Sequence, residues 1–348
     1  MPRRTDGDAP VLSQRVLNRT LLQRQLLLER AETSLPEAVG QAGGLQTQYA
    51  PSGYVGLWTR VADLERDALT RALEDRSVIQ ATLMRTTIHL VSRRDYWKLS
   101  MGTQRAQQEW AQRTQLLPPE RKLQSTADQL RAALADGPKT VKELGDVAKG
   151  FIGSLGYWVP LVRVPPSGTW ERRRADRLAI AEDWVGPIDA TEDEGLRYLV
   201  EMYLRAFGPA PWKDIAQWAG INVTDARRGA TNLALVPYRD EAGGELVDLE
   251  SMTVADADAA APVRFLPHWD ANLLVHARRT GLLPEEHRPR VFSTKNPFSV
   301  GTYLVDGRVV GSWSLKDGRI VLDPYEELDA RERKAVELER EALEVFHS

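Results

Sequence analysis

Two stretches of the chain share one pattern: Leu130–Leu144, LRAALADGPKTVKEL, and Leu204–Ile215, LRAFGPAPWKDI. In each, an apolar helix-like segment runs into a Gly-Pro pair, and an apolar residue stands seven positions after the glycine. Glycine suits the C-terminal cap of a helix and proline cannot continue one, so both stretches predict a helix, a tight turn and a second helix. This is the skeleton of a helix-turn-helix, and its repetition predicts similar small units in series.

A β-hairpin is predicted after each helix pair. Behind the first, Trp158–Val164 and Thr169–Trp170 flank a Pro-Pro-Ser-Gly turn. Behind the second, Ala234–Tyr238 and Glu245–Leu249 flank a turn that contains two glycines. Apolar runs around such turns are typical of hairpins. A helix pair followed by a hairpin predicts a winged-helix unit.

A third unit of this kind is predicted at the start of the chain. Val11–Arg30 has leucines at helical spacing, and a second helix is expected near Ser34, with Pro36 in its first turn. The β-rich segment Gln80–Ser92 would be the wing. The last third differs, because Asp306-Gly307 and Asp317-Gly318 predict tight hairpins ahead of a charged helix at Glu326–Phe346.

The sequence therefore predicts a mainly helical α+β fold with tandem winged-helix units and a C-terminal antiparallel β subdomain. The expected segments are a disordered tail at 1–10, units at 11–120, 121–190 and 191–255, and the β-rich subdomain with its closing helix at 256–348.

Composition restricts the chemistry. The chain has 348 residues, a net charge of −3, five histidines and no cysteine, which excludes disulfides, thiolate zinc sites, iron–sulfur clusters and a cysteine nucleophile. No two histidines stand four apart, and no glycine-rich phosphate-binding loop is present. We expect no metal, no cofactor and no membrane span, and a monomer in the cytoplasm of a bacterium.

One short segment stands out between the first helices and the first wing: Gly43-Gly44-Leu45-Gln46-Thr47-Gln48. In an extended strand Gln46 and Gln48 point to the same side, whereas in a helix they diverge. Surface glutamines beside a helix end remain the alternative, since glutamine is mostly exposed.

This segment resembles the glutamine–x–glutamine motif of the AlkZ-like DNA glycosylases, a family whose YcaQ-type branch has aspartate in place of the second glutamine. Thr47 stands where the family usually carries a more hydrophobic residue, and Ala271 separates Asp270 from an asparagine that relatives often place directly after it. The resemblance covers most of the chain from Val11 to Asp323 and extends through Arg85–Val91, Trp269–Leu274 and Tyr303–Gly307.

The resemblance implies hydrolysis of the N-glycosidic bond of alkylated purines in double-stranded DNA, without a cofactor. Gln46 and Gln48 would be the catalytic residues, which hold a water and stabilise an oxocarbenium-like sugar. The AlkZ branch also implies bulky adducts and interstrand crosslinks as substrates, in DNA repair or in self-resistance to a genotoxin. No lysine is indicated as a Schiff-base nucleophile, so a monofunctional glycosylase is expected.

Further residues are candidates for DNA contact or for the cleft. Trp269 and Asp270 are expected to shape the cleft, although a helix cap would equally explain Asp270. His89 is either a DNA contact or a structural histidine, and Arg85 with Thr86 either touches phosphate or completes a turn. The predicted DNA contacts are Arg85, Thr86, His89, Arg172, Arg174, Arg278, Arg279, His287 and Arg288.

Two other classes of protein share these features. A winged-helix transcriptional regulator would usually be a dimer that reads DNA through an arginine-rich recognition helix, whereas Asn222–Asn232 holds only Arg227 and Arg228. A protein-interaction scaffold is the other alternative. Salt-sensitive DNA binding would count against the scaffold, and base release would separate the enzyme from the regulator.

Overall fold

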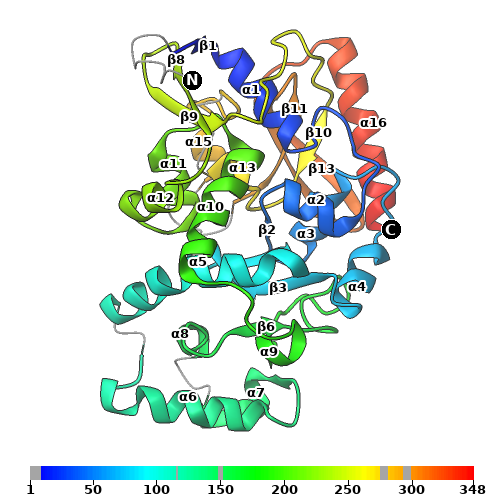
Figure 1. Ribbon diagram of the computed structural model, residues 1–348. Helices are drawn as coiled ribbons and strands as arrows, with labels where there is room; N and C mark the ends of the chain where they lie inside the picture. Colours follow the sequence, from blue (N-terminus) through cyan, green and yellow to red (C-terminus); the bar gives the residue numbers. More distant parts are fainter. Residues whose placement is uncertain (1–8, 115–116, 148–151, 275–280, 293–298) are drawn as a thin grey trace.

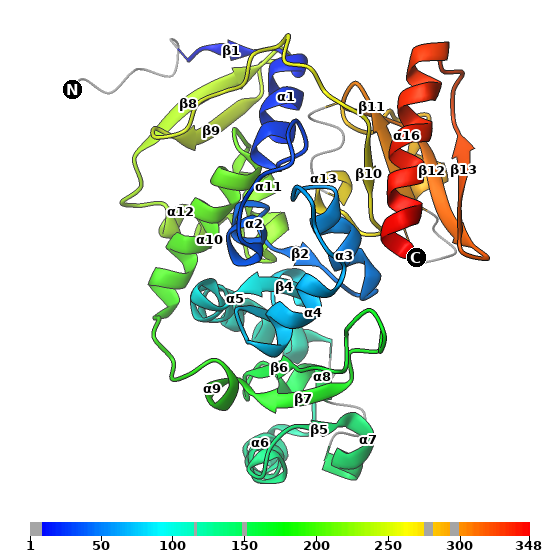
Figure 2. The ribbon, with the colours of Figure 1, turned by 90° about the vertical axis from the view of Figure 1, so that its right-hand side faces the viewer.

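The computed structural model describes residues 9–114, 117–147, 152–274, 281–292 and 299–348. Helices and three β-sheets are combined in an elongated molecule (Figure 1). Two sheets lie side by side at one end, and the third crosses the middle (Figure 2). The expectation of a mixed α+β fold is confirmed. Among the described residues, no helix has the length and apolar character needed to cross a bilayer.

The middle sheet has six antiparallel strands in the order β2-β4-β3-β6-β7-β5. Strand β3 pairs with β6, so that Gln80 lies opposite Arg163 and Ala81 opposite Val162. The hairpins of the first two expected units therefore form one sheet, which spans the predicted border at residues 120 and 121. The strands are β2 Leu45–Gln46, β3 Val78–Thr82, β4 Ile88–Ser92, β5 Lys139–Thr140, β6 Leu161–Arg163 and β7 Arg177–Ile180.

The second predicted hairpin has a different return strand. Strand β6 pairs with β7, Arg177–Ile180, and the expected partner Thr169–Trp170 lies in the connecting loop. Ser167 closes this loop, since its Oγ accepts hydrogen bonds from the backbone N–H groups of Asp176 (2.7 Å) and Arg177 (3.1 Å). The loop thus folds back on itself before the strand begins, and the prediction for Thr169–Trp170 was wrong.

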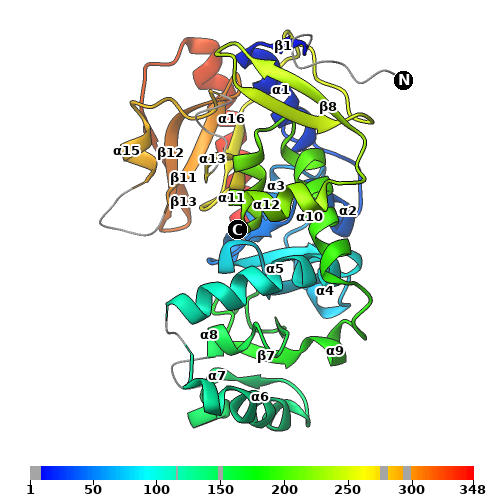
Figure 3. The ribbon, with the colours of Figure 1, turned by 60° about the vertical axis from the view of Figure 1, so that its left-hand side comes forward.

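Two long helices pack against each other beside the middle sheet, and the first of them contacts β3 and β4. Helices α5, Arg93–Arg113, and α10, Glu192–Phe207, approach so closely that a Cβ on Gly102 would lie 2.6 Å from the carbonyl carbon of Gly195. Helices α11 Trp212–Ala219 and α12 Val223–Gly229 pack against α10, and α8 Ile152–Leu155 contacts α5. Helix α9 Ala181–Trp184 contacts β6 and β7, whereas α6 Glu120–Leu134 and α7 Val141–Leu144 lie at the far end of the molecule, beyond β7 (Figure 3).

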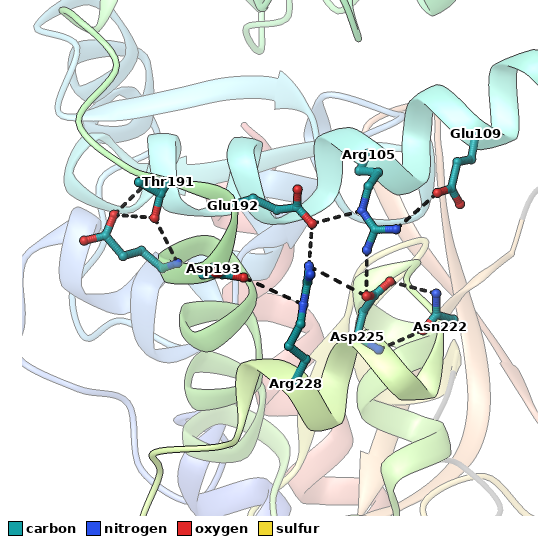
Figure 4. Close-up of polar contacts among 9 residues, drawn as sticks. Arg105, Glu109, Thr191, Glu192, Asp193, Asn222, Asp225 and Arg228 are labelled. Atoms are coloured by element: carbon teal, nitrogen blue, oxygen red, sulfur yellow. Dashed lines mark hydrogen bonds and ion pairs between the residues drawn. The ribbon is translucent and has the colours of Figure 1, made fainter.

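Ion pairs fix these helices to one another (Figure 4). Arg105 of α5 donates to Glu192 at the start of α10 (2.9 Å) and to Asp225 of α12 (2.6 Å). Arg228 of α12 donates to the same carboxylate of Glu192. Each cation therefore binds residues of another helix, and α5, α10 and α12 are held as one block.

A small sheet holds the start of the described chain. Strand β1, Val11–Leu12, pairs in parallel with β8, Leu235–Asp240, which pairs with β9, Glu245–Leu249. The carbonyl of Pro10 accepts a hydrogen bond from the N–H of Arg239 at 2.9 Å. Residues 1–8 of the expected disordered tail lie outside the described residues. Helices α1 Gln14–Arg24, α2 Leu35–Gln41, α3 Pro51–Trp58 and α4 Asp67–Glu74 follow.

The third sheet has the order β10-β11-β12-β13 and packs against the last helix, α16. Asp306-Gly307 joins β11 to β12, and both residues have positive φ (46° and 75°), which confirms the expected tight turn. Asp317-Gly318 does the same between β12 and β13 (48° and 77°). The elements are β10 Arg264–Leu266, α13 Ala271–Leu274, α15 Arg288–Val291, β11 Gly301–Val305, β12 Arg308–Lys316, β13 Arg319–Pro324 and α16 Ala330–His347.

Candidate active site

A two-glycine turn delivers Gln46 to the edge of the middle sheet. Gly43 and Gly44 both have φ of +78°, which favours glycine. A Cβ on Gly43 would also lie 2.7 Å from the ring of Phe207, so only glycine fits there. The chain then enters β2, where Gln46 lies opposite His89 of β4.

The Gln46 carboxamide is held by a half-buried arginine. Arg85 donates from Nη2 to Gln46 Oε1 (2.9 Å) and from Nη1 to the carbonyl oxygen of Trp218 (2.6 Å). Burial lowers the pKa of Arg85 to about 10, so the guanidinium is still charged at neutral pH. Arg85 and Thr86 both have positive φ, 52° and 59°, in the connection between β3 and β4. The turn anticipated for these two residues is present, and the Arg85 side chain binds protein groups.

Gln48, two residues after Gln46, contacts the first residue of β4. Its exposed side chain accepts at Oε1 a hydrogen bond of 3.0 Å from the backbone N–H of Ile88. Between the two glutamines, the N–H of Thr47 donates to the carbonyl of Ile88 at 2.8 Å. The segment is thus extended, and both carboxamide oxygens accept hydrogen bonds from residues 85–88.

Thr47, which stands where the family usually carries a more hydrophobic residue, has a hydrogen-bond partner inside the sheet. The Thr47 side chain is buried, and its Oγ1 accepts a hydrogen bond of 3.2 Å from Nε2 of Gln80 on β3. Gln80 is itself 2% exposed. A polar middle residue is therefore accommodated because β3, the second strand from β2 in the sheet, supplies a buried amide donor.

His89 is a structural histidine and does not reach the surface. The side chain is 2% exposed, and Nδ1 donates to the carbonyl oxygen of Thr87 at 3.0 Å. Burial, aided by the charge of Arg85, lowers the pKa of His89 to about 3. The prediction of DNA contact by His89 is corrected accordingly, because the imidazole is neutral and enclosed.

Asp270 is also structural. It forms a buried ion pair with Arg60 at 2.9 Å, and its Oδ1 accepts from the N–H of Asn272 at 3.0 Å in the first turn of α13. Asp270 therefore caps α13, which was the alternative explanation from the sequence. Its burial does not support the expected role in the cleft. Trp269, half-buried, donates its backbone N–H to Ser299 Oγ at 2.6 Å.

The cavity near this segment is lined by the two residues that precede Trp269. Pro267 and His268 border a cavity of about 260 Å³ together with Tyr49, the residue that follows Gln48. None of these three residues was predicted from the sequence. The only available signal was the position of Pro267 and His268 beside the Trp-Asp pair, and neither residue type carries a strong functional pattern.

The predicted DNA-contacting residues fall in three places. Arg172 and Arg174 are exposed on the loop that precedes β7, where Arg174 lies 3.0 Å from Asp176. Arg288 contacts Glu285 at 3.3 Å. His287 is buried and lies 3.5 Å from Glu326, so the prediction that His287 contacts DNA is corrected as well. Arg278 and Arg279 lie outside the described residues.

The arginines of α12 are engaged within the protein. Arg228 binds Glu192 and lies 3.7 Å from Asp193 (Figure 4). Arg227 stacks on Trp212 with 4.9 Å between the guanidinium carbon and the ring centroid. A recognition helix needs such side chains free to reach base edges. This arrangement does not favour the regulator.

Comparison with known proteins gives one consistent result. The family described as "DNA glycosylase AlkZ-like" matches residues 39–346. The chain belongs to this AlkZ-like DNA glycosylase family. A curated relative from Streptomyces sahachiroi, named interstrand DNA cross-link repair glycosylase, is 25% identical over 352 residues, which cover 91% of this chain and 92% of the relative.

The fold of this AlkZ-like glycosylase agrees with a solved structure. Streptomyces sahachiroi DNA glycosylase AlkZ superposes with a TM-score of 0.79 at 22% sequence identity, over 97% of this chain and 96% of the other. At that identity the likeness describes the fold. The resemblance to the AlkZ-like family is therefore confirmed, and the roles of individual residues remain predictions.

Proposed function

We propose that this AlkZ-like glycosylase hydrolyses the N-glycosidic bond of N7-alkylated guanines in duplex DNA, with Gln46 and Gln48 as its catalytic residues. Bulky adducts and interstrand crosslinks are included among its substrates, as the name of the Streptomyces sahachiroi relative suggests. The observation that carries the proposal is the fixed pair of carboxamides, each bound at its oxygen by a donor from residues 85–88. Such prior orientation is what electrostatic catalysis requires.

The two glutamines differ in their surroundings, and this difference suggests separate roles. Gln46 Oε1 faces the charged guanidinium of Arg85, which makes the oxygen a weaker acceptor. Gln48 Oε1 faces a neutral backbone amide and belongs to an exposed side chain. We therefore assign the attacking water to the second lone pair of Gln48, and to Gln46 the task of donating from Nε2 to the water or the substrate.

Alkylation supplies most of the leaving-group activation. A purine alkylated at N7 carries a positive charge and departs as a neutral base, so a strong general acid is unnecessary. The enzyme has to place water and to stabilise the oxocarbenium-like sugar with fixed dipoles. Neither step needs a cofactor, and without a lysine nucleophile the product is an abasic site in an intact strand.

DNA binding is assigned to the exposed arginines of the loop before β7. Arg172 and Arg174 supply positive charge on a chain whose net charge is −3, and phosphate contacts need only a local basic face. We retain tandem winged-helix units as the architectural interpretation of the helix pairs and their hairpins. We also retain a monomer in the bacterial cytoplasm, where the DNA substrate lies.

Release of N7-methylguanine from a duplex tests the proposal. Wild-type protein is compared with Gln46→Ala and Gln48→Ala, and release is measured by chromatography under single-turnover conditions. Each substitution is expected to lower the rate by about a hundredfold, similar to the loss of one fixed transition-state donor. Duplex binding, measured by fluorescence anisotropy, should remain unchanged.

The outcomes separate the parts of the proposal. Unchanged release in both variants would retain the enzyme and overturn the glutamine mechanism. No release by the wild type, from the methyl lesion or from a bulky N7 adduct, would overturn the glycosylase activity. Strand cleavage without alkali treatment would overturn the monofunctional assignment.

A further inference from the structure

The cavity lined by Tyr49, the residue after Gln48, is bordered by a closed circle of ring contacts. Tyr49 meets His268 edge-to-face (centroids 5.6 Å apart), and His268 meets Trp313 (6.0 Å). Trp313 meets His347 (5.9 Å), and His347 meets Trp170 (5.2 Å), both edge-to-face. Arg173 completes the circle, because its guanidinium lies 5.6 Å from the Trp170 centroid and 5.8 Å from that of Tyr49.

These six residues come from four separate parts of the fold, and we call the space among them the ring pocket. Tyr49 precedes α3, Trp170 and Arg173 lie on the loop before β7, His268 and Trp313 belong to the third sheet or its flank, and His347 ends α16. Figure 2 shows the end of α16 beside that sheet and near α3. All six line the cavity of about 260 Å³.

The walls combine two buried indole rings with the small side chain of Ser52. Trp170 and Trp313 are buried, and Trp313 Nε1 already donates to the carbonyl of Leu266 at 2.9 Å. Ser52, which lines the same cavity and is 3% exposed, has no hydrogen-bond partner for its Oγ among the described residues. This Oγ is not exposed to the cavity, so Ser52 borders the cavity through its other atoms.

The aromatic wall of the pocket is neutral, and one arginine stands at its border. Burial lowers the pKa of both His268 and His347, so that these imidazoles are neutral at physiological pH and the aromatic wall carries no charge there. Arg173 is exposed, and its Nη1 donates to the hydroxyl of Tyr49 at 2.9 Å. It lies between Arg172 and Arg174 in sequence, at the border where the pocket meets the proposed DNA-binding loop.

We propose that the ring pocket binds a flat aromatic ring system of the lesion. This inference rests on the proposed function, since the pocket begins one residue after Gln48. Ring faces and edges of protein side chains favour offset or edge-to-face contact with another ring. Two parts of a lesion have this chemistry: the alkylated purine itself and an aromatic group carried by the alkyl substituent.

A binding experiment tests the pocket without base release. Calorimetry with free 7-methylguanine, and separately with benzyl alcohol as a single-ring probe, is done on wild type, His268→Ala and Ser52→Leu. Loss of the His268 ring should weaken binding about three- to tenfold, the usual contribution of an aromatic pair. Ser52→Leu should abolish binding because its side chain fills the cavity. Trp184→Ala is the matched control: this half-buried ring stacks under Arg76 at 4.0 Å and does not line the pocket.

Excision from two duplexes then identifies the occupant. If the purine occupies the pocket, His268→Ala lowers release from both the N7-methylguanine and the N7-benzylguanine duplex. If the aromatic substituent occupies it, only release from the benzyl lesion falls. The proposed pocket is overturned if His268→Ala and Ser52→Leu leave the binding of both probes unchanged while their thermal unfolding matches that of the control. Absence of base release by the wild type overturns the proposed function instead, and the calorimetry still decides the pocket.

Discussion

Arg85 links the glutamine segment to the third helix pair, and this position makes it a positioning residue. Its guanidinium joins Gln46 Oε1 to the carbonyl of Trp218, at the end of α11. A Cβ on Gly220 would lie 2.7 Å from the N of Arg85, so helix and turn are in close contact. The orientation of Gln46 therefore depends on packing outside its own unit.

Replacement of Arg85 should separate catalysis from DNA binding. Arg85→Met keeps the length of the side chain but leaves Gln46 without its donor, so the rate of base release should fall about tenfold or more. The Kd for duplex DNA and its salt dependence should not change, because the wild-type guanidinium binds protein groups. A reduced salt slope in anisotropy titrations would instead identify Arg85 as a phosphate contact. Arg85→Lys, which retains one donor, is the partial-rescue control.

His89 should make folding sensitive to acid. Its pKa is about 3 in the folded protein, below the ordinary value of 6.5, because burial disfavours the charged form. Above pH 6.5 both states are neutral. Below it the unfolded chain binds a proton that the folded protein does not, so stability decreases as pH falls, by about 2 kcal/mol between pH 7 and 5 from this residue.

The variant His89→Asn isolates this effect, because its side-chain amide can still donate to the carbonyl of Thr87. The free energy of unfolding is measured by urea titration at pH 7 and at pH 5. Its decrease between these pH values should be about 2 kcal/mol smaller in the variant than in the wild type. Equal decreases in the two proteins would show that His89 takes up its proton in the folded state.

Individual residues were predictable where a local pattern determines them. Gln46 and Gln48 lie in a short extended segment, one of the two conformations considered from the sequence. The burial of His89, Asp270 and His287 was not predictable, because it depends on elements distant in sequence, such as Arg60 and Glu326. The ring pocket was not predictable for the same reason, since Tyr49 and His347 are separated by most of the chain.

At the scale of elements, the crossing of α5 and α10 should be the most sensitive point to added volume. In Gly102→Ala the new Cβ would lie 2.7 Å from the carbonyl oxygen of Gly195. Overpacking of this kind costs about 1–3 kcal/mol, which urea denaturation would measure. Gly153→Ala in α8 is the control, because no heavy atom lies within 4 Å of its added Cβ. Equal stability of both variants would show that the helices can separate without cost.

Elements defined by turns were predicted well from the sequence. The hairpins β3–β4, β8–β9 and β11–β12–β13 follow from apolar runs around tight connections. The return strand of the second hairpin was misplaced because Ser167 closes a longer loop through hydrogen bonds that no spacing reveals. Pairing of β3 with β6 and of β1 with β8 joins distant segments, and long-range pairing leaves little local signal.

For the whole molecule, DNA binding should depend on a few exposed arginines. The double variant Arg172→Ala/Arg174→Ala should weaken duplex binding and reduce the slope of log K against log salt by about two, close to one for each phosphate that is no longer neutralised. Anisotropy titrations over a range of KCl concentrations measure this slope. Arg331→Ala/Lys334→Ala, on the exposed start of α16, is the matched control with the same change in charge. An equal slope in both double variants would place the DNA elsewhere.

The shared six-stranded sheet has a consequence for any attempt to divide the protein. A fragment that ends near residue 120 would expose the full edge of β3, and the complementary fragment would expose β6. Uncovered strand edges of this kind recruit other chains, so each half should aggregate when expressed alone. Co-expression of the two halves should restore soluble material, because each supplies the strand that the other lacks.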